Sequence, residues 1–428
     1  MRVQSVLKWV SPKTREILAL VCVAVFAGLL SVLYSKFFEI FEKLAARLAE
    51  LFTGSLFLFA PLCFIFSAYL VKRFSPAAAG SGIPQIMVAQ DLETSNRQKI
   101  SQLLSLRVLL IKIVSSLICI LGGGVTGREG PTLHVAASLF YFISSRVSRW
   151  IAHLDSRVWI VAGASAGLAS AFNTPLGGIV FAIEELSPAH FERLKLVSIS
   201  AVIVSGMIAQ ALLGPYLYLN VPSLSVSGLN VWVGVLILAL ATGLIGAAFG
   251  QLLFLSCKKV RSFSTRAKYF TWPLVMGLLV ATGFYFFGNN AIGPGRGLML
   301  KLLNGQSLDH PVLLIFVRLL SNVATYSTGV AGGIFAPTLA SGALIGAELS
   351  RLFSMVDPDL FILLGMCGLL SAVTHAPFTS FVLMLEMTDK RLATFPLMSC
   401  ALLAYFISRW VQRESFYKRA KAFYEETA

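Results

Sequence analysis

Residues 122–131 read GGGVTGREGP, a glycine-rich turn that contains an Arg–Glu pair. Long apolar stretches flank this turn, residues 109–121 before it and residues 132–143 after it. Glycine permits tight backbone turns, and proline suits the first turn of a helix because it needs no N–H partner there. The pattern therefore predicts that a helix begins at the end of the turn, with Glu129 at its N-terminus.

The composition is that of a chain that lies in lipid. Of its 428 residues, 57% are hydrophobic and 13% are charged, and the mean hydropathy is +0.79. A soluble domain carries roughly 25% charged residues. Several apolar runs approach the roughly 20 residues that a helix needs to cross a bilayer. Examples are residues 17–34, 56–71, 231–255 and 395–407. The sequence thus predicts an all-α polytopic integral membrane protein.

The basic residues predict how the chain is oriented. The formal net charge is +15, but the charges form no continuous basic face of the kind that binds nucleic acid. They cluster between apolar runs, at residues 72–73, 97–99, 258–268 and 409–421, whereas residues 215–230 carry no charge. By the positive-inside rule, the basic segments and both termini face the cytoplasm. The expected location is the plasma (inner) membrane, with an even number of crossings and no cleaved signal peptide.

No pattern in the sequence indicates an enzyme. The six cysteines are scattered singly, and the five histidines form no HExxH motif, so neither a metal site nor a cofactor is predicted. Residues 122–129 resemble a phosphate-binding loop, but Arg128 and Glu129 stand where such a loop has lysine and a hydroxyl residue. We therefore expect a transport protein rather than a membrane-embedded enzyme.

The second half of the chain repeats two elements of the first half. Residues 130–139 (GPTLHVAASL) resemble residues 336–345 (APTLASGALI), and residues 167–185 resemble residues 368–386. The matched prolines lie 206 residues apart in the first pair (337 − 131) and 202 apart in the second (377 − 175). Two elements in the same order and at nearly the same spacing predict an internal structural repeat.

The predicted boundaries are residues 1–213 for the first membrane repeat, 214–228 for an extracytoplasmic linker and 229–428 for the second repeat. Because both termini are placed inside and the linker outside, each half crosses an odd number of times and the repeats are inverted. Transporters with inverted repeats bind their substrate near the bilayer midplane, where broken helices meet. Duplication of packing elements for stability alone is the alternative.

Three segments run small residues into a proline and then into a helix-like pattern, namely residues 77–86, 127–133 and 332–339. Each presents a helix N-terminus, whose free N–H groups carry partial positive charge and bind anions. In a membrane such groups are tolerated only where they line a cavity. Together they predict an anion site built mainly from backbone, to which Ser81 adds a hydroxyl. No Lys or Arg ligand is expected, since a full charge would bind the anion too tightly for transport.

Glu129 would lie among N–H groups suited to an anion, so its carboxylate can occupy the anion's place and leave it when protonated. Desolvation favours the neutral carboxyl and the amides favour the ionised form, so we expect its protonation to change near physiological pH. The alternative is that Glu129 pairs with Arg128 in a surface turn.

Glu184 and Glu185 end an apolar run, where ionisable residues often serve as proton relays. The alternative is that both residues cap the helix end and pair with basic loop residues. For Glu185 we favour the relay, which would pass protons toward Glu129 by a route separate from that of the anion. For Glu184, which recurs as Glu386 in the second half, we favour a structural role at a helix end.

The segments GSGIP (80–84), GREGP (127–131) and GGIFAP (332–337), in this order, resemble the three signature stretches of the CLC chloride channel and transporter family. Residues 172–185 (FNTPLGGIVFAIEE) and the SFY at 415–417 match as well, so that the resemblance covers nearly the whole chain. It implies a homodimer in which each subunit has its own CLC-type pore, built from many tilted and half-length helices.

Carried over by position, the resemblance also implies the roles of individual residues. From spacing alone, Tyr417 is better explained as an interfacial aromatic residue, and only the resemblance places it in the pore. The implied substrate is chloride, exchanged for protons without a cofactor. The residues concerned are Ser81 and Tyr417 as side-chain hydroxyls of the anion site, Ile334 and Phe335 as its backbone amide donors, Glu129 as the gating glutamate and Glu185 as the internal proton glutamate.

The chain departs from the family pattern at Gln85 and Met87, where many bacterial relatives carry acids. The chain ends eleven residues after Tyr417 (428 − 417), so no cytoplasmic CBS pair is expected. A passive voltage- or pH-gated chloride channel of the same family is the alternative function, because only Glu185 argues for proton coupling. A cation carrier is disfavoured, since it would need midplane carboxylates rather than converging helix N-termini.

Overall fold

The computed structural model describes residues 12–425 apart from ten short gaps. The gaps are 52–53, 93–95, 148–154, 187–190, 215–218, 220–223, 225–227, 264, 354–356 and 389–390. The described chain is almost entirely helical, and its only extended pairing consists of two isolated backbone bridges. The predicted linker at 214–228 falls largely outside the described residues. The all-α prediction is confirmed.

The first half of the chain forms nine α-helices among the described residues. These are α2 (Pro12–Leu51), α3 (Leu56–Phe74), α4 (Ile83–Asp91), α5 (Arg97–Leu103), α6 (Leu106–Leu121), α7 (Glu129–Val147), α8 (Ser156–Phe172), α9 (Pro175–Phe181) and α10 (Phe191–Leu213). A 3₁₀ turn, η1 (Pro76–Ala78), precedes α4, and a π-helical turn, η2 (Ala182–Leu186), follows α9.

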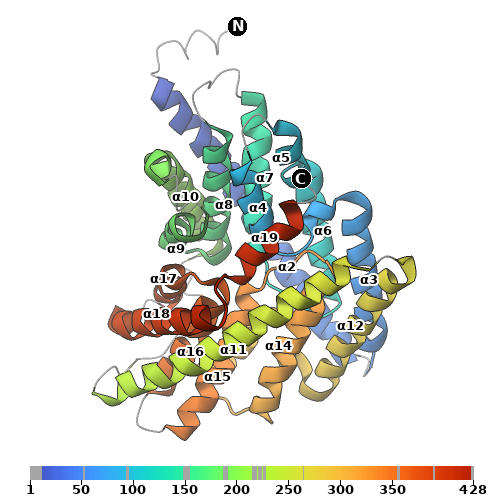
Figure 1. Cartoon of the computed structure of the whole chain (residues 1–428), viewed down its shortest axis with the longest axis vertical. Coiled ribbons are helices and arrows are strands. Elements are labelled where there is room, and N and C mark those ends of the chain that lie inside the picture. The colour runs from blue at the N-terminus through green and yellow to red at the C-terminus, as the bar shows by residue number, and fades with distance from the viewer. Residues whose placement is uncertain are drawn as a thin grey trace.

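The second half follows the same plan. Its helices are α11 (Asn230–Arg261), α12 (Arg266–Phe287), α13 (Arg296–Leu303), α14 (Pro311–Ser327), α15 (Phe335–Leu352), α16 (Pro358–Thr374), α17 (Pro377–Thr388), α18 (Thr394–Val411) and α19 (Phe416–Glu425). In Figure 1 the yellow-to-red helices fill most of the lower half, while α19 reaches up to α4 among the earlier helices.

Helix lengths vary far more than in a simple bundle. By length and composition, six stretches of the described chain can cross a membrane, and they lie at 14–51, 56–74, 97–121, 230–261, 267–290 and 394–411. By contrast α9 has 7 residues and α4 has 9, which is too short to span a hydrocarbon core of about 30 Å at 1.5 Å per residue. Short helices of this kind place their ends, and therefore their dipoles, inside the membrane.

The internal repeat is visible in the helix boundaries. Helices α8 and α16 both have 17 residues, and each is preceded by an N-cap aspartate whose carboxylate accepts the N–H two residues on. Asp155 accepts from Arg157 at 2.9 Å, and Asp357 accepts from Asp359 at 3.0 Å. The residue that follows each helix, Asn173 or His375, has the left-handed backbone conformation. A short helix that starts with proline, α9 or α17, comes next. The same local chemistry thus produces the same three features twice.

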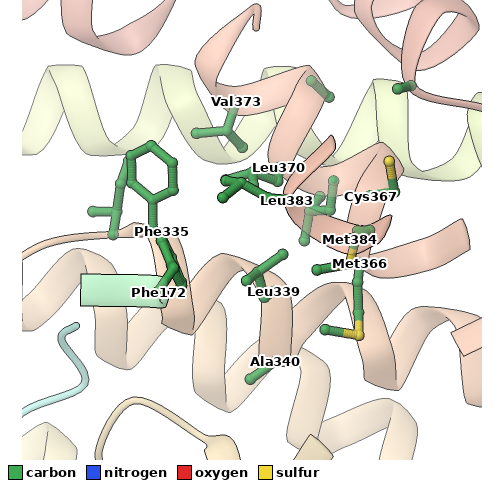
Figure 2. Packing of buried hydrophobic residues seen from close by; sticks show 14 of the residues in the cluster. Phe172, Phe335, Leu339, Ala340, Met366, Cys367, Leu370, Val373, Leu383 and Met384 are labelled. Carbon is green, nitrogen blue, oxygen red and sulfur yellow. The ribbon is translucent and has the colours of Figure 1, made fainter. Parts of the chain in front are cut away.

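Small residues bring α15 and α16 into close contact. A side-chain Cβ at Gly342 or Gly346 would overlap the main chain of α16, and one at Gly365 would overlap α15. Such close approach is how membrane helices gain packing energy without a hydrophobic driving force. In Figure 2 Leu339, Leu370 and Leu383 fill the space between α15, α16 and α17, with Phe172 and Phe335 at one side. This packing fixes the N-terminal end of α15, where the candidate site lies.

Candidate anion site

Main-chain hydrogen bonds join the three glycine-rich segments. The Gly80 N–H donates to the Val330 carbonyl at 2.9 Å, and the Gly332 N–H donates to the Gly80 carbonyl at 3.0 Å. Gly127 and Gly333 exchange two hydrogen bonds of 2.8 Å. The segment at 332–339 therefore lies between the other two. The predicted convergence of these segments is confirmed.

Each of the three segments leads into a helix, as predicted. Helix α4 begins at Ile83, α7 at Glu129 and α15 at Phe335. Gly82 has a φ of +98°, a backbone conformation that residues other than glycine rarely adopt. The starts of α4 and α7 touch directly, because a Cβ on Gly130 would lie 2.7 Å from Ser81 Cβ and 3.0 Å from its carbonyl oxygen.

Ser81 is fully buried at this junction. Its Oγ accepts a 3.3 Å hydrogen bond from the Ile83 N–H, and its own N–H donates to the Tyr326 hydroxyl at 3.3 Å. The Tyr326 hydroxyl therefore fixes the serine backbone from the C-terminal half of the chain. The sequence contains no motif that would have singled out Tyr326.

Two further buried side chains hold the loop before Ser81. Gln85 Nε2 donates to the carbonyls of Ala77 and Ala79, at 2.9 and 2.7 Å. The Lys112 ammonium donates to the carbonyls of Ala79 and Gly80, at 3.3 and 2.9 Å. Lys112 is fully buried. In the sequence it stands out as the one charged residue in the apolar run 109–121. Its ammonium group is bonded to these loop carbonyls, which agrees with an anion site that has no cation as a direct ligand.

Ile334 and Phe335 form the N-terminal end of α15. Ile334 is the N-cap residue, and its own side chain makes no capping hydrogen bond. The first N–H groups of a helix have no intrahelical acceptor, so those at this end are directed at whatever lies beyond it. The Phe335 ring packs 6.1 Å from Phe172 and 6.2 Å from Phe181, centroid to centroid, which keeps the helix end within an apolar wall.

Tyr417 lies within the protein and not at its lipid surface. The residue is fully buried, and its ring stacks on Phe335 at a centroid distance of 6.1 Å. Its hydroxyl has no hydrogen-bond partner of good geometry in the described part of the chain, although the Ser81 side chain is near enough to interact with it. The interpretation of Tyr417 as an interfacial residue is therefore wrong. Spacing could not reveal this, because α19 folds back from the C-terminus.

Glu129 is 1% exposed. Its carboxylate interacts with two main-chain amides, its own and that of Ala336 in the first turn of α15. Oε2 has no hydrogen-bond partner among the described residues, and a Cβ on Gly127 would overlap this atom. The adjacent Arg128 donates from Nη1 to the Ser35 carbonyl on α2, at 2.9 Å. Because Glu129 is buried, the alternative of a surface turn is wrong.

Glu184 and Glu386 cap helices in opposite halves of the chain. Glu184 accepts from the N–H groups of Phe378 and Thr379 at the start of α17, at 3.0 and 2.7 Å. Glu386 accepts from Leu176 and Gly177 at the start of α9, at 3.1 and 2.7 Å. The structural role predicted for Glu184 is confirmed, and each half of the molecule thereby closes a helix of the other.

Glu185 differs from the neighbouring Glu184 in its hydrogen bonds. It lies on η2, is half-buried, and its Oε1 is enclosed without a hydrogen-bond partner in the described chain. Tyr417 lies within electrostatic reach of both Glu185 and Glu129. The structure therefore brings Ser81, Tyr417, Glu129 and the start of α15 together, and Glu185 is near enough to Tyr417 to interact with it electrostatically. Met87 packs against the main apolar cluster.

The arrangement matches known proteins along most of the chain. The family model described as voltage gated chloride channel matches residues 63–409. An H(+)/Cl(-) exchange transporter ClcA of Vibrio campbellii is 30% identical over 366 residues, covering 82% of this chain and 75% of the relative. The ClcA of Salmonella paratyphi B is 30% identical over 404 residues, covering 88% and 83%.

Solved structures of known transporters also resemble this chain. A slow cyanobacterial Cl⁻/H⁺ antiporter superposes with a TM-score of 0.83 at 25% identity, covering 96% of this chain and 98% of the other. A CLC-type fluoride/proton antiporter gives 0.78 at 22% identity, covering 95% and 97%, and so shares the fold. With its three converging segments and these matches, the chain is a member of the CLC family, the voltage gated chloride channels and their exchanger relatives.

Proposed function

We propose that the protein is a secondary active transporter that exchanges chloride for protons across the inner membrane. The observation that carries this proposal is the position of the Glu129 carboxylate. It interacts with the Ala336 amide in the first turn of α15, beside the amides of Ile334 and Phe335. A carboxylate and a chloride ion cannot both occupy one helix N-terminus, so protonation of Glu129 and entry of the anion are linked.

The anion ligands in this proposal are the hydroxyls of Ser81 and Tyr417 and the amides of Ile334 and Phe335. The buried and unpartnered Tyr417 hydroxyl supports this, since a buried polar atom without a partner is costly and a bound anion would satisfy it. All four groups are neutral donors. They stabilise an anion while leaving it free to move on, which transport requires.

Glu185 is proposed as the internal proton glutamate. Its enclosed Oε1 has no hydrogen-bond partner in the described chain, so the carboxylate is not committed to a structural bond as Glu184 is. Tyr417 lies within electrostatic reach of both Glu185 and Glu129. Protons and chloride would then share the outer part of the path near Glu129 and separate on the inner side of Tyr417.

The relatives support the same reading, since those named above are called H(+)/Cl(-) exchange transporters and one solved structure is a Cl⁻/H⁺ antiporter. No cofactor is needed for such exchange, and the partners are chloride, protons and lipid. We place both termini in the cytoplasm. The basic ends of α3 and α11 lie near α19, where Arg261 donates to the Phe423 carbonyl at 2.8 Å.

We also propose that the protein is a homodimer with one pore per subunit. Glu184 and Glu386 are only half-buried, on a face that carries the exposed side chains of Leu176 and Phe378. A carboxylate facing hydrocarbon is costly, so this face is better covered by a second copy of the chain than by lipid.

A passive chloride channel is the second candidate, favoured by the description of the matching family model. The reversal potential of the purified protein in liposomes separates the two, under a fixed chloride gradient with and without a pH gradient. For the exchanger, the pH gradient shifts the reversal potential, and Glu129→Gln and Glu185→Gln each abolish the shift while anion flux persists. A reversal potential that follows chloride alone would establish the channel and remove the proposed role of Glu185.

A further inference from the structure

A cavity of about 770 Å³ lies outside the candidate anion site. It is bounded by the C-terminal ends of α3 and α11, the start of α6, the end of α14 and one side of α19. Its volume is within the range of about 300–1,000 Å³ that is typical of ligand pockets. Neither Ser81, Tyr417, Glu129 nor Glu185 lines it. The proposed transport cycle gives this cavity no role.

The charged side chains that line the cavity are all cationic. They are Lys72 on α3, Arg107 on α6 and Arg261 on α11, and no Asp or Glu is among the lining residues. Lys72 Nζ lies 3.5 Å from the centroid of the Tyr269 ring, and the Arg261 guanidinium lies 4.7 Å from that of Tyr424. None of the three cations forms an ion pair in the described chain, so the cavity as a whole attracts an anion.

Arg107 lies at an electrostatically unfavourable position in its own helix. It is the second residue of α6, where the helix N-terminus already carries partial positive charge. A cation in a first turn costs stability, and an anion bound in the cavity would offset that cost. The cap of this helix is neutral, since Ser105 Oγ accepts from the Val108 N–H at 3.4 Å.

The walls of the cavity are apolar and aromatic, with Val71, Val108, Val260 and Phe263 among them. Phe74, 44% exposed, stands at its edge on α3, a helix that also bears Leu58 and Phe66, which are 63% and 52% exposed. Such exposed side chains are those expected to face lipid. The cavity thus lies between basic helix ends and a helix whose exposed apolar side chains suit contact with acyl chains.

We propose that this cavity binds an anionic phospholipid, with the phosphate headgroup held by Lys72, Arg107 and Arg261 and an acyl chain lying against α3. Basic pockets between membrane helices on the cytoplasmic side are suited to anionic headgroups, and each nearby cation strengthens their attraction. A soluble phosphate would use the same cations, but it would leave the apolar walls uncovered.

The bound lipid would act on the anion site through a shared wall. Gly80, Tyr326 and Phe416 line the cavity, and each adjoins a component of the site. Gly80 precedes Ser81, the Tyr326 hydroxyl accepts the Ser81 N–H, and Phe416 precedes Tyr417. The rings of Tyr326 and Phe416 pack against each other with centroids 5.4 Å apart. Lipid in the cavity should therefore stabilise the geometry of the site.

Lipid binding is measured by native mass spectrometry of the full chain in detergent, titrated with phosphatidylglycerol or phosphatidylcholine. We expect phosphatidylglycerol to be retained preferentially. Lys72→Gln and Arg107→Gln should each weaken its binding about fivefold, the effect of removing one nearby cation. The control is Lys258→Gln. Lys258 lies in the last turn of α11, as Arg261 does, but it does not line the cavity, so this variant should bind lipid as the wild type does.

Equal binding of the two lipids, or unchanged binding in the Lys72→Gln/Arg107→Gln double variant, would overturn the proposal. Displacement of phosphatidylglycerol by inorganic phosphate would overturn the lipid as occupant and leave a phosphate site. If the double variant bound less lipid only because it was unfolded, its thermal transition in the absence of phosphatidylglycerol would fall. An unchanged or higher transition therefore accompanies the expected result, since the variant also removes a cation from the first turn of α6. The measurement is one of binding, so it is independent of whether protons are coupled to chloride.

Discussion

At the scale of single residues, Glu184 and Glu185 provide the sharpest contrast. Glu184→Gln should lower the free energy of unfolding by about 1–3 kcal/mol, because an amide N–H₂ would face the donors at the start of α17. Glu185→Gln should leave stability nearly unchanged, because Oε1 makes no described hydrogen bond. Thermal unfolding in detergent checks both variants. Proton coupling should be retained in Glu184→Gln and lost in Glu185→Gln. If either variant lost both stability and coupling, the proposed division of roles would be contradicted.

The sequence identified residues where their chemistry was unusual for their surroundings. Glu129 is detectable as an acid between two apolar stretches and Glu185 as an acid at the end of one, and both carboxylates are enclosed within the described structure. Tyr417 was misjudged by spacing, because burial of a residue near the C-terminus depends on where α19 packs. Tyr326 could not be found at all, since its contact with Ser81 joins residues that are 245 positions apart.

At the scale of helices, the site depends on how closely α7 approaches the segment before α4. Gly130→Ala would place a methyl group 2.7 Å from Ser81 Cβ and 3.0 Å from the Ser81 carbonyl oxygen. Because main-chain atoms are involved, the two segments must separate, at a cost of about 1–3 kcal/mol. We expect weaker chloride binding by isothermal titration calorimetry and a lower thermal transition.

Gly297→Ala is the matched control for this substitution. Gly297 also lies in a helix, α13, but a Cβ there meets no atom within 4 Å. Alanine is favoured over glycine in a helix by roughly 1 kcal/mol, so this variant should be as stable as the wild type or slightly more so. Normal chloride binding by Gly130→Ala would show that the spacing of these segments does not set the site.

Helix starts were predictable because glycine and proline act locally, on their own turn of backbone. The meeting of the three starts was predictable only in outline, from the repeat and from the need to enclose free N–H groups in a membrane. The sequence did not reveal the bonds that tie the segments together, since two glycines exchanging main-chain hydrogen bonds leave no side-chain pattern. Nor did it reveal Lys112 and Gln85 as supports of the loop, although both were visible as polar residues in unusual places.

At the scale of the whole molecule, the repeat explains the exchange of caps between the halves. Glu184 from the first half closes α17, and Glu386 from the second closes α9, so neither half completes its short helices alone. The two halves therefore depend on each other at these helix starts. The halves are better understood as parts of one transport unit than as independent domains.

The face formed by α9 and α17 is the one that we propose a second subunit covers. Phe378→Cys, at a position 51% exposed, should form a covalent dimer with a short bifunctional thiol reagent in vesicles, in a background carrying Cys22→Ser. Phe316→Cys on α14, at a position 59% exposed, is the matched control and should remain monomeric because its face meets lipid. Dimer bands are read by gel electrophoresis at decreasing protein-to-lipid ratios. Dimer formation that persists on dilution for Phe378→Cys alone supports a specific interface, since random collisions would diminish for both variants. Equal cross-linking of the two would mean that the half-buried carboxylates of Glu184 and Glu386 are shielded within one subunit.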